Sequence, residues 1–350
     1  MTRRPRPALL VLDDREGLVR AAPGMVDLRG RCDVRVLDRP LADVHDDDLT
    51  DVRLLLAIRE RTPLDAPTLA RFPRLELLLQ TGTHAYHVDA EEVARRNIPV
   101  TLGRRARAVR AAVPELTLLL MLACLRRLGE ASKAIGRGEW PALVGRTLAG
   151  RRLGVLGLGR HGRRVAELCR VLGMEVVAWD RAGERDGSAT PSGRSGPDSV
   201  TLLPLSDLLT SSDVVSVHLR LSDESRGLLD GERLRAMKPG SVLVNTARGV
   251  MLDEHALIDV LRTGPLAAAG LDVFGEEPLA DGHPLRTLPN VVLTPHVGWT
   301  TEEVLTEYAE IAAQQAVDYL SGDLDRADLL DPEVQPAPNA LGGLRPGSPA

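Results

Sequence analysis

Short apolar runs alternate with amphipathic stretches along most of the chain, starting at residue 8. In the first 100 residues these runs are short and rich in Leu, Val and Ile, which is typical of strands in a sheet buried on both faces. The strands predicted in this way span 8–12, 33–37, 53–58, 75–79 and 98–100, and a helix over 88–96 precedes the last of them. Alternation of β and α elements predicts a parallel sheet covered by helices.

A second alternating series begins near residue 150. Its predicted strands span 153–156, 175–179, 214–219, 241–245, 269–273 and 291–294, a number that matches a full dinucleotide-binding sheet. A mostly apolar helix over 115–128 precedes this series, and we expect Pro114 to lie near its first turn. A helix over 301–320 follows the series, with Thr301 and Gly322 as caps.

The two series predict two domains, since 350 residues exceed what one core usually contains. We expect an α/β fold of two Rossmann-like, doubly wound parallel-sheet domains with a cleft between them. One domain is discontinuous, with residues 1–110 and 300–330, and the other spans 111–299. Residues 181–199 and 331–350 are rich in Gly, Ser and Pro, so we expect a loop and a disordered tail there.

Composition excludes several classes of protein. The net charge is −5, and the arginines are interspersed with acidic residues, which argues against nucleic acid as a partner. Cys32, Cys124 and Cys169 have no paired spacing, so we expect core thiols in a reducing compartment and no metal site. The longest apolar stretch is too short to cross a membrane and no signal peptide is evident, so we expect a cytoplasmic protein.

A glycine-rich turn is the strongest single motif. Gly157, Gly159 and Gly162 form G-x-G-x-x-G between a predicted strand and a helix, the context in which a helix N-terminus receives a pyrophosphate. Asp180 ends the next strand, where a carboxylate binds a ribose 2′-OH and repels a 2′-phosphate. NAD is therefore the expected cofactor, although Arg181 leaves NADP open.

Three further segments carry the residue types that reduction of a 2-keto acid requires. Arg248 follows one predicted strand and can grip a carboxylate through two hydrogen bonds. His296 follows the last strand and titrates near neutral pH, as a general acid/base must. We expect Glu277 to orient His296 and to raise its pKa. All three residues lie at the carboxyl ends of parallel strands, where ligands bind in such sheets.

The segments GLGRHG, VHLRLSDESRGLLDGERLRAMKPGSVLVNTARG, AAAGLDVFGEEPL and LPNVVLTPHVGW strongly resemble the D-isomer-specific 2-hydroxyacid dehydrogenases, a family that includes phosphoglycerate dehydrogenases and hydroxypyruvate reductases. The resemblance implies Arg248, Glu277 and His296 as the catalytic set. It implies a homodimer formed through the dinucleotide domains and a substrate loop at Gly82 and Thr83. The cofactor contacts that it implies, besides the glycines, are Arg160, His161, Asp180, His218, Ser222, Thr246 and Asp272.

The sequence leaves alternatives open for the function and for the substrate. The family also resembles NAD(H)-sensing corepressors that dimerise and dock peptides, so an interaction protein on the same fold is the second hypothesis. Formate dehydrogenases of this kind have Gln where Glu277 stands, so a hydroxy acid is favoured. Arg220 departs from the usual Pro of its segment. The cluster of Arg104, Arg105, Arg107 and Arg110 is either a solvated face or a grip on a phosphorylated or dicarboxylic substrate.

Overall fold

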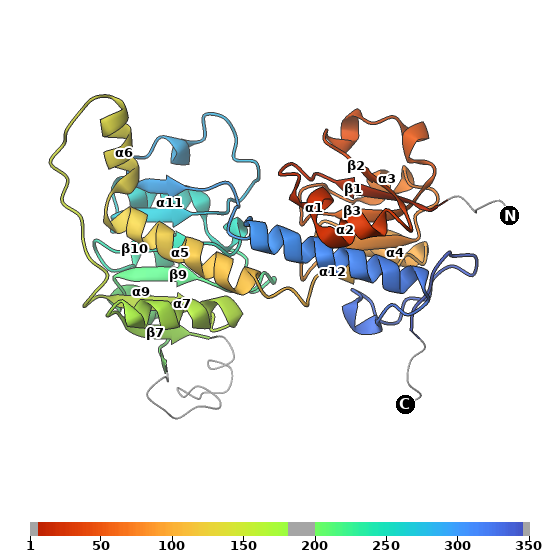
Figure 1. The fold of residues 1–350 in the computed structure, drawn as a ribbon. Coiled ribbons are helices and arrows are strands. Elements are labelled where there is room, and N and C mark those ends of the chain that lie inside the picture. Colours follow the sequence, from red (N-terminus) through yellow and green to blue (C-terminus); the bar gives the residue numbers. More distant parts are fainter. Residues whose placement is uncertain (1–5, 181–199, 346–350) are drawn as a thin grey trace. The chain divides into compact units, whose positions relative to one another are not determined.

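The chain forms two compact units. The computed structural model describes residues 6–180 and 200–345. Within these limits unit 1 comprises residues 6–108 and 301–345, and unit 2 comprises residues 109–180 and 200–300. Each unit has its own parallel sheet (Figure 1). The two sheets confirm the predicted α/β class.

Unit 1 contains a five-stranded parallel sheet in the order β2-β1-β3-β4-β5. Its strands are β1 (Ala8–Leu12), β2 (Asp33–Val36), β3 (Val52–Ala57), β4 (Leu77–Gln80) and β5 (Val100–Leu102). All five were predicted, because each central strand is a nearly continuous apolar run buried on both faces. Leu54, Leu55 and Leu56 are fully buried.

The helices of unit 1 come from both ends of the chain. They are α1 (Leu18–Ala21), α2 (Pro23–Leu28), α3 (Ala66–Ala70), α4 (Ala90–Arg95) and the long α12 (Glu302–Leu320). Helix α12 lies beside α1 and α2 (Figure 1), and its Glu310 accepts a hydrogen bond of 2.8 Å from the backbone N–H of Gly24. Its ends are as predicted, because Thr301 caps Val304 and Gly322 follows with φ 76°.

Unit 2 contains a seven-stranded parallel sheet in the order β12-β11-β10-β9-β6-β7-β8. Its strands are β6 (Arg152–Leu156), β7 (Glu175–Trp179), β8 (Thr201–Leu202), β9 (Val214–Val217), β10 (Val242–Asn245), β11 (Ala268–Leu271) and β12 (Val291–Leu293). The sequence predicts all of them except β8, whose two residues at the edge of the sheet are too few to show a period.

Helices cover both faces of this sheet. One core holds side chains of α5 (Val109–Leu125) and α7 (Arg160–Val171), and the other holds those of α9 (Leu205–Ser211), α10 (Gly231–Arg235) and α11 (Glu254–Arg262). A further helix, α6 (Leu128–Gly136), follows α5. The predicted position of Pro114 was wrong. Helix α5 begins at Val109, so Pro114 lies inside the helix rather than in its first turn.

Residues 331–345 differ from the disordered tail that the composition predicts. Val334 is buried, the backbone N–H of Gly343 donates to Tyr319, and that of Arg345 donates to Leu324. Residues 346–350 and the predicted loop over 181–199, Arg181 included, lie outside the described residues. Among the described helices none is long and apolar enough to span a membrane.

The three cysteines are buried thiols without disulfide bonds, as the sequence predicts. Burial raises the pKa of Cys124 to about 12 and that of Cys169 to about 12, so both stay protonated at neutral pH. Within 6–180 and 200–345, no group of three or more His, Cys, Asp or Glu side chains is arranged to hold a metal ion.

Candidate active site

The predicted cofactor and catalytic residues of unit 2 follow the carboxyl ends of six strands. The glycine turn follows β6, Asp180 follows β7, His218 follows β9, Thr246 and Arg248 follow β10, Asp272 follows β11, and His296 follows β12. Because all these strands are parallel, their carboxyl ends form one edge of the sheet. Gly82 and Thr83 follow β4 in unit 1.

The glycine turn has the shape that close approach of a phosphate requires. Gly157 has φ 97°, and a Cβ at Gly162 would lie 2.0 Å from the carbonyl oxygen of Gly157, so neither position accepts a side chain. Gly159 is the N-cap of α7, is exposed, and has no heavy atom within 4 Å of an added Cβ. The first amides of α7 receive no side-chain cap, so they can bind an anion.

The strand order reverses between β6 and β9, and the glycine turn lies at this switch point. A Cβ at Gly157 would be 3.1 Å from the carbonyl oxygen of His218, and the Gly157 N–H donates to Trp179, the residue before Asp180, at 2.9 Å. The His218 ring lies 2.8 Å from Ser216 Oγ. Burial, and then the nearby His161, lower the pKa of His218, so its ring is neutral at pH 7.

The turn that carries Arg248 is fixed by Asn245, a residue that the sequence reasoning missed. Its amide nitrogen donates to the Arg248 carbonyl at 2.9 Å, and its side-chain oxygen accepts from the Ala247 N–H at 2.9 Å. Gly249 has no room for a side chain, because an added Cβ would lie 1.9 Å from the carbonyl carbon of Phe274. An amide side chain at the end of an apolar run was the signal in the sequence, and the structure buries it.

Asp272 is 1% exposed and uses its carboxylate to hold the loop before and after His296. Oδ1 accepts from Thr294 Oγ1 at 2.6 Å and from the Val297 N–H at 2.9 Å, and Oδ2 accepts from the Gly298 N–H at 2.9 Å. Burial raises the pKa of Asp272, against the effect of these hydrogen bonds. These contacts position the loop, and the cofactor contact that the resemblance implies for Asp272 stays a prediction.

His296 and Glu277 form the central pair of the site. Nδ1 of His296 lies 2.7 Å from Oε2 of Glu277, and Oε1 of Glu277 accepts from the Phe274 N–H at 3.0 Å. Desolvation raises the pKa of Glu277, but the hydrogen bond and charge of His296 outweigh it and the pKa is lowered overall. Because the Glu277 carboxylate contacts Nδ1 of the His296 ring, Nε2 is the ring nitrogen that can exchange a proton with a substrate.

Two other predicted cofactor residues are held by neighbouring hydroxyls. Thr246 Oγ1 lies 2.9 Å from Thr117 Oγ1 on α5. The backbone N–H of Ser222 donates to Ser225 Oγ at 2.8 Å, and Ser225 Oγ donates in turn to the carbonyl of Arg220 at 2.9 Å. The Arg220 side chain is exposed, as is Arg160 at the start of α7.

The predicted substrate loop of unit 1 packs against an arginine that the sequence reasoning did not single out. Arg59 follows β3 with φ 57°, and its side chain is 9% exposed. An added Cβ at Gly82 would lie 2.6 Å from its Nη1. An arginine directly after a long apolar run was the available signal in the sequence for a charged side chain at this strand end.

Part of the arginine cluster has structural partners inside unit 1. Arg105 forms a bidentate ion pair with the buried Asp328, and Arg104 donates to the Ala327 carbonyl at 2.9 Å. The backbone N–H of Arg107 donates to Glu307 at 2.7 Å. Arg104 and Arg105 thus connect the segment after β5 to the turn that follows α12.

Comparison with known proteins gives the family. Residues 118–298 match the model of the D-isomer specific 2-hydroxyacid dehydrogenase NAD binding domain. This chain belongs to the D-isomer specific 2-hydroxyacid dehydrogenase family. The predictions of family membership, of an NAD-dependent oxidoreductase and of NAD as cofactor are confirmed, and the substrates of the family are small 2-keto and 2-hydroxy acids.

Relatives with assigned activities include two kinds of enzyme. The chain is 37% identical over 268 residues to a glyoxylate reductase of Aeropyrum pernix, covering 74% of this chain and 77% of the relative. It is 32% identical over 284 residues to a D-3-phosphoglycerate dehydrogenase of Archaeoglobus fulgidus, covering 81% of this chain and 52% of that relative.

Solved structures of the family share the fold. A phosphoglycerate oxidoreductase of Vibrio cholerae aligns with a TM-score of 0.77 at 32% identity, covering 89% of this chain and 98% of that one. A D-lactate dehydrogenase of Aquifex aeolicus, solved with NAD and lactic acid, aligns with a TM-score of 0.75 at 24% identity over 92% of this chain and 98% of that one.

Proposed function

We propose that unit 2 carries the complete catalytic set for reduction of a small 2-keto acid to the D-2-hydroxy acid, with Arg248, Glu277 and His296 in named roles. The 2.7 Å contact between His296 Nδ1 and Glu277 Oε2 is the observation that carries this proposal. Bound NADH supplies the hydride that the keto carbon accepts. His296 Nε2 gives its proton to the keto oxygen, which becomes the hydroxyl, and takes that proton back in the oxidation direction.

Arg248 binds the substrate carboxylate in this proposal. Its backbone is fixed by Asn245 and by the packing of Gly249 on Phe274, so the guanidinium starts from a defined position. A guanidinium offers two parallel N–H groups to a carboxylate, and this grip orients the carbonyl that reacts. Glu277 positions the imidazole through its contact with Nδ1.

The proposed cofactor contacts lie at the same carboxyl edge of the unit 2 sheet. We propose that the amides at the start of α7 bind the pyrophosphate and that Asp180 accepts hydrogen bonds from the ribose hydroxyls. Arg160, His161, His218, Ser222 and Thr246 line the rest of the cofactor path. Asp272 acts through the loop that it holds.

We also propose that the protein is a homodimer formed through unit 2. Helices α5 and α6 and the segment after them expose large apolar side chains, an arrangement that a second copy of the chain would bury: Leu119, Leu122, Leu128, Ile135, Trp140 and Val144. Trp140 is 92% exposed. Light scattering should give a dimer, and Trp140→Ser with Ile135→Ser should shift it towards the monomer.

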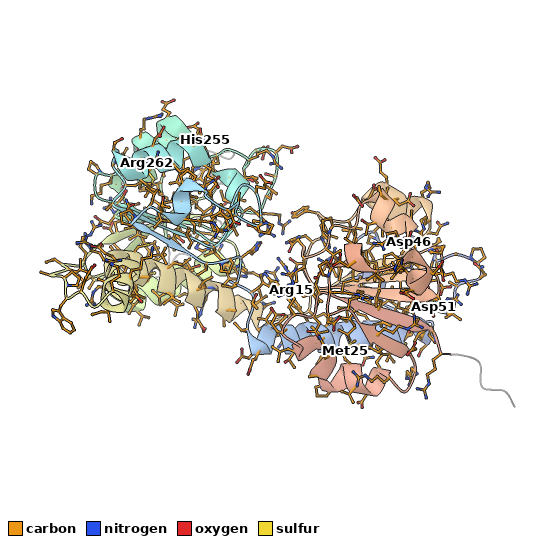
Figure 2. All side chains as sticks on the ribbon, turned by 90° about the horizontal axis from the view of Figure 1, so that it is seen from above. Arg15, Met25, Asp46, Asp51, His255 and Arg262 are labelled. Carbon is orange, nitrogen blue, oxygen red and sulfur yellow. The ribbon has the colours of Figure 1, made fainter. Side chains whose placement is uncertain are left out.

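An absorbance assay at the NADH maximum tests the catalytic proposal. Purified protein is mixed with NADH or NADPH and, in turn, glyoxylate, hydroxypyruvate, pyruvate, 2-oxoglutarate and 3-phosphohydroxypyruvate. We expect oxidation of NADH with at least one keto acid, and a loss of about a hundredfold or more in kcat/KM in Arg248→Ala. Arg262→Ala on α11, labelled in Figure 2, is the matched control and should keep full activity. If no keto acid causes oxidation of NADH but the protein still binds NADH tightly, the NADH-sensing interaction protein would be favoured instead.

A further inference from the structure

A carboxylate lies within the predicted substrate-binding region of unit 1, and nothing in the catalytic proposal uses it. Glu60 follows β3, and His84 follows β4, the neighbouring strand of the parallel sheet. One oxygen of Glu60 lies 3.2 Å from Nε of Arg59, and the other lies 3.2 Å from Nδ1 of His84. Glu60 therefore joins the carboxyl ends of two strands at the edge of the sheet where ligands bind.

Arg59 is the cationic side chain that packs on the predicted substrate loop. Its guanidinium lies on the backbone of Gly82, and Nη2 lies 3.4 Å from Nε2 of His84. The backbone N–H of Arg59 donates to Thr81 Oγ1 at 2.9 Å, which fixes the start of the side chain. A buried guanidinium without a nearby carboxylate would attract a phosphate or a second carboxylate strongly.

Carboxylates accompany the arginines nearest to the carboxyl ends of β1 and β3. Four of these arginines each have a carboxylate partner in unit 1. The pairs are Arg15 with Asp13 at 3.3 Å, Arg20 with Asp14 at 3.0 Å, Arg59 with Glu60 at 3.2 Å and Arg61 with Glu16 at 2.7 Å. Of these four carboxylates, Glu60 is the one that also contacts His84, two residues after Gly82, so its charge lies beside the predicted substrate loop.

We propose that Glu60 is a specificity-determining residue that excludes substrates with a second anionic group. The favoured class is a small 2-keto acid with one carboxylate and an uncharged substituent. This inference rests on the proposed function, in which Gly82 and Thr83 belong to the substrate loop. An additional anion beside Arg59 would meet the Glu60 carboxylate in a partly buried site, where like charges repel more strongly than in water.

Competition between keto acids tests the inference. With NADH saturating, we expect the wild-type kcat/KM for glyoxylate or hydroxypyruvate to exceed that for 3-phosphohydroxypyruvate or 2-oxoglutarate. Glu60→Gln keeps two polar atoms for Arg59 and His84 but removes the charge. It should raise the kcat/KM ratio of the dianionic to the monoanionic substrates by about tenfold or more. Glu60→Ala, which removes the charge without adding an amide, should shift the ratio in the same direction.

Asp51→Asn is the control, since it changes the net charge of unit 1 by the same amount. Asp51 precedes β3, pairs with Arg35 at 2.6 Å, and lies at the opposite end of unit 1 from Arg15 (Figure 2). It should leave the ratio within about twofold of the wild-type value. A wild-type preference for the phosphorylated or dicarboxylic substrate, or an unchanged ratio in both Glu60 variants, overturns the inference. Loss of activity with every keto acid in the wild type would instead contradict the proposed function.

Discussion

His296 Nδ1 and Glu277 Oε2 are 2.7 Å apart, although 18 residues of chain separate them and each follows a different strand. The backbone of His296 has φ 54°, a conformation that ordinary residues adopt rarely, and Asp272 holds the chain on both sides of it. The imidazole is thus oriented by a carboxylate on the ring and by hydrogen bonds to the main chain around it.

Replacement of His296 should remove proton transfer and leave cofactor binding intact. In His296→Asn we expect kcat to fall by about 10²- to 10⁴-fold, because the substitution removes the proposed proton donor to the keto oxygen. The Kd for NADH, measured by fluorescence titration, should stay within about twofold. His255→Asn, on the exposed side of α11 (Figure 2), should change neither quantity. An unchanged kcat in His296→Asn would contradict the acid/base role.

The charge of Glu277 should stabilise the fold at neutral pH and lose that effect in acid. Its folded-state pKa is lowered from 4.5, so the stabilisation is present above pH 4.5 and disappears as the pH falls through the lower, folded-state pKa. Urea unfolding at pH 7 and pH 3.5 should show Glu277→Gln less stable than the wild type at pH 7 by about 1 kcal/mol or less, given solvent screening. The difference should shrink at pH 3.5. A difference that grows in acid would contradict the lowered pKa.

Substitution of two glycines in the same turn should affect different properties, namely stability for Gly162 and NADH affinity for Gly159. Gly162→Ala places a Cβ 2.0 Å from the carbonyl oxygen of Gly157, so we expect a loss of about 1–3 kcal/mol in the free energy of unfolding. Gly159→Ala meets no heavy atom within 4 Å and has φ −71°, so its stability should stay close to that of the wild type. Its affinity for NADH should still fall about tenfold or more, because the added methyl group faces the proposed pyrophosphate site. Equal NADH affinity in Gly159→Ala and wild type would place the pyrophosphate elsewhere.

Asp272→Asn should loosen the loop that carries His296. An amide has one acceptor atom where three donors now converge, so its NH₂ group must face at least one of the N–H groups of Val297 and Gly298 or the Thr294 hydroxyl. We expect a loss of about 1–3 kcal/mol in stability and a lower kcat with a nearly unchanged Kd for NADH. Calorimetry and steady-state kinetics measure both. A drop in NADH affinity alone would instead support a direct contact between Asp272 and the cofactor.

The preference for NAD should depend on Asp180. Replacing its carboxylate in Asp180→Ala removes the repulsion of a 2′-phosphate, so kcat/KM with NADPH should rise about tenfold relative to that with NADH. Glu175→Ala, at the other end of β7, is the control and should leave the ratio unchanged. A ratio that does not move in Asp180→Ala would separate Asp180 from the ribose.

Strand positions were predictable from the sequence because parallel strands buried on both faces leave continuous apolar runs. The β3 run, with fully buried Leu54, Leu55 and Leu56, is the clearest example. Edge strand β8 has two residues, of which Thr201 is exposed, and leaves no such pattern. The start of α5 was misplaced because Pro114 was taken as a first-turn residue, although the helix continues through it.

Site residues were predictable where a motif names the chemistry, and not where a contact joins distant segments. Gly157, Arg248 and His296 stand in recognisable motifs. Asn245 acts through backbone groups of its own turn, which no motif marks. Arg59 and Glu60 contact Gly82 and His84, which follow another strand, and spacing along the chain does not show such contacts. The loop contacts of Asp272 were not predictable for the same reason, since its donors come from the segment after β12.

Unit 1 is assembled from segments on either side of unit 2 in the chain. During synthesis, residues 1–108 therefore leave the ribosome long before α12, the helix that packs on α1 and α2 and buries Tyr308 and Tyr319. Unit 2 is continuous and can close its sheet as soon as β12 has emerged. The cofactor-binding half can thus fold first during synthesis, whereas the half that holds Glu60 and Gly82 is completed only after α12 has been synthesised.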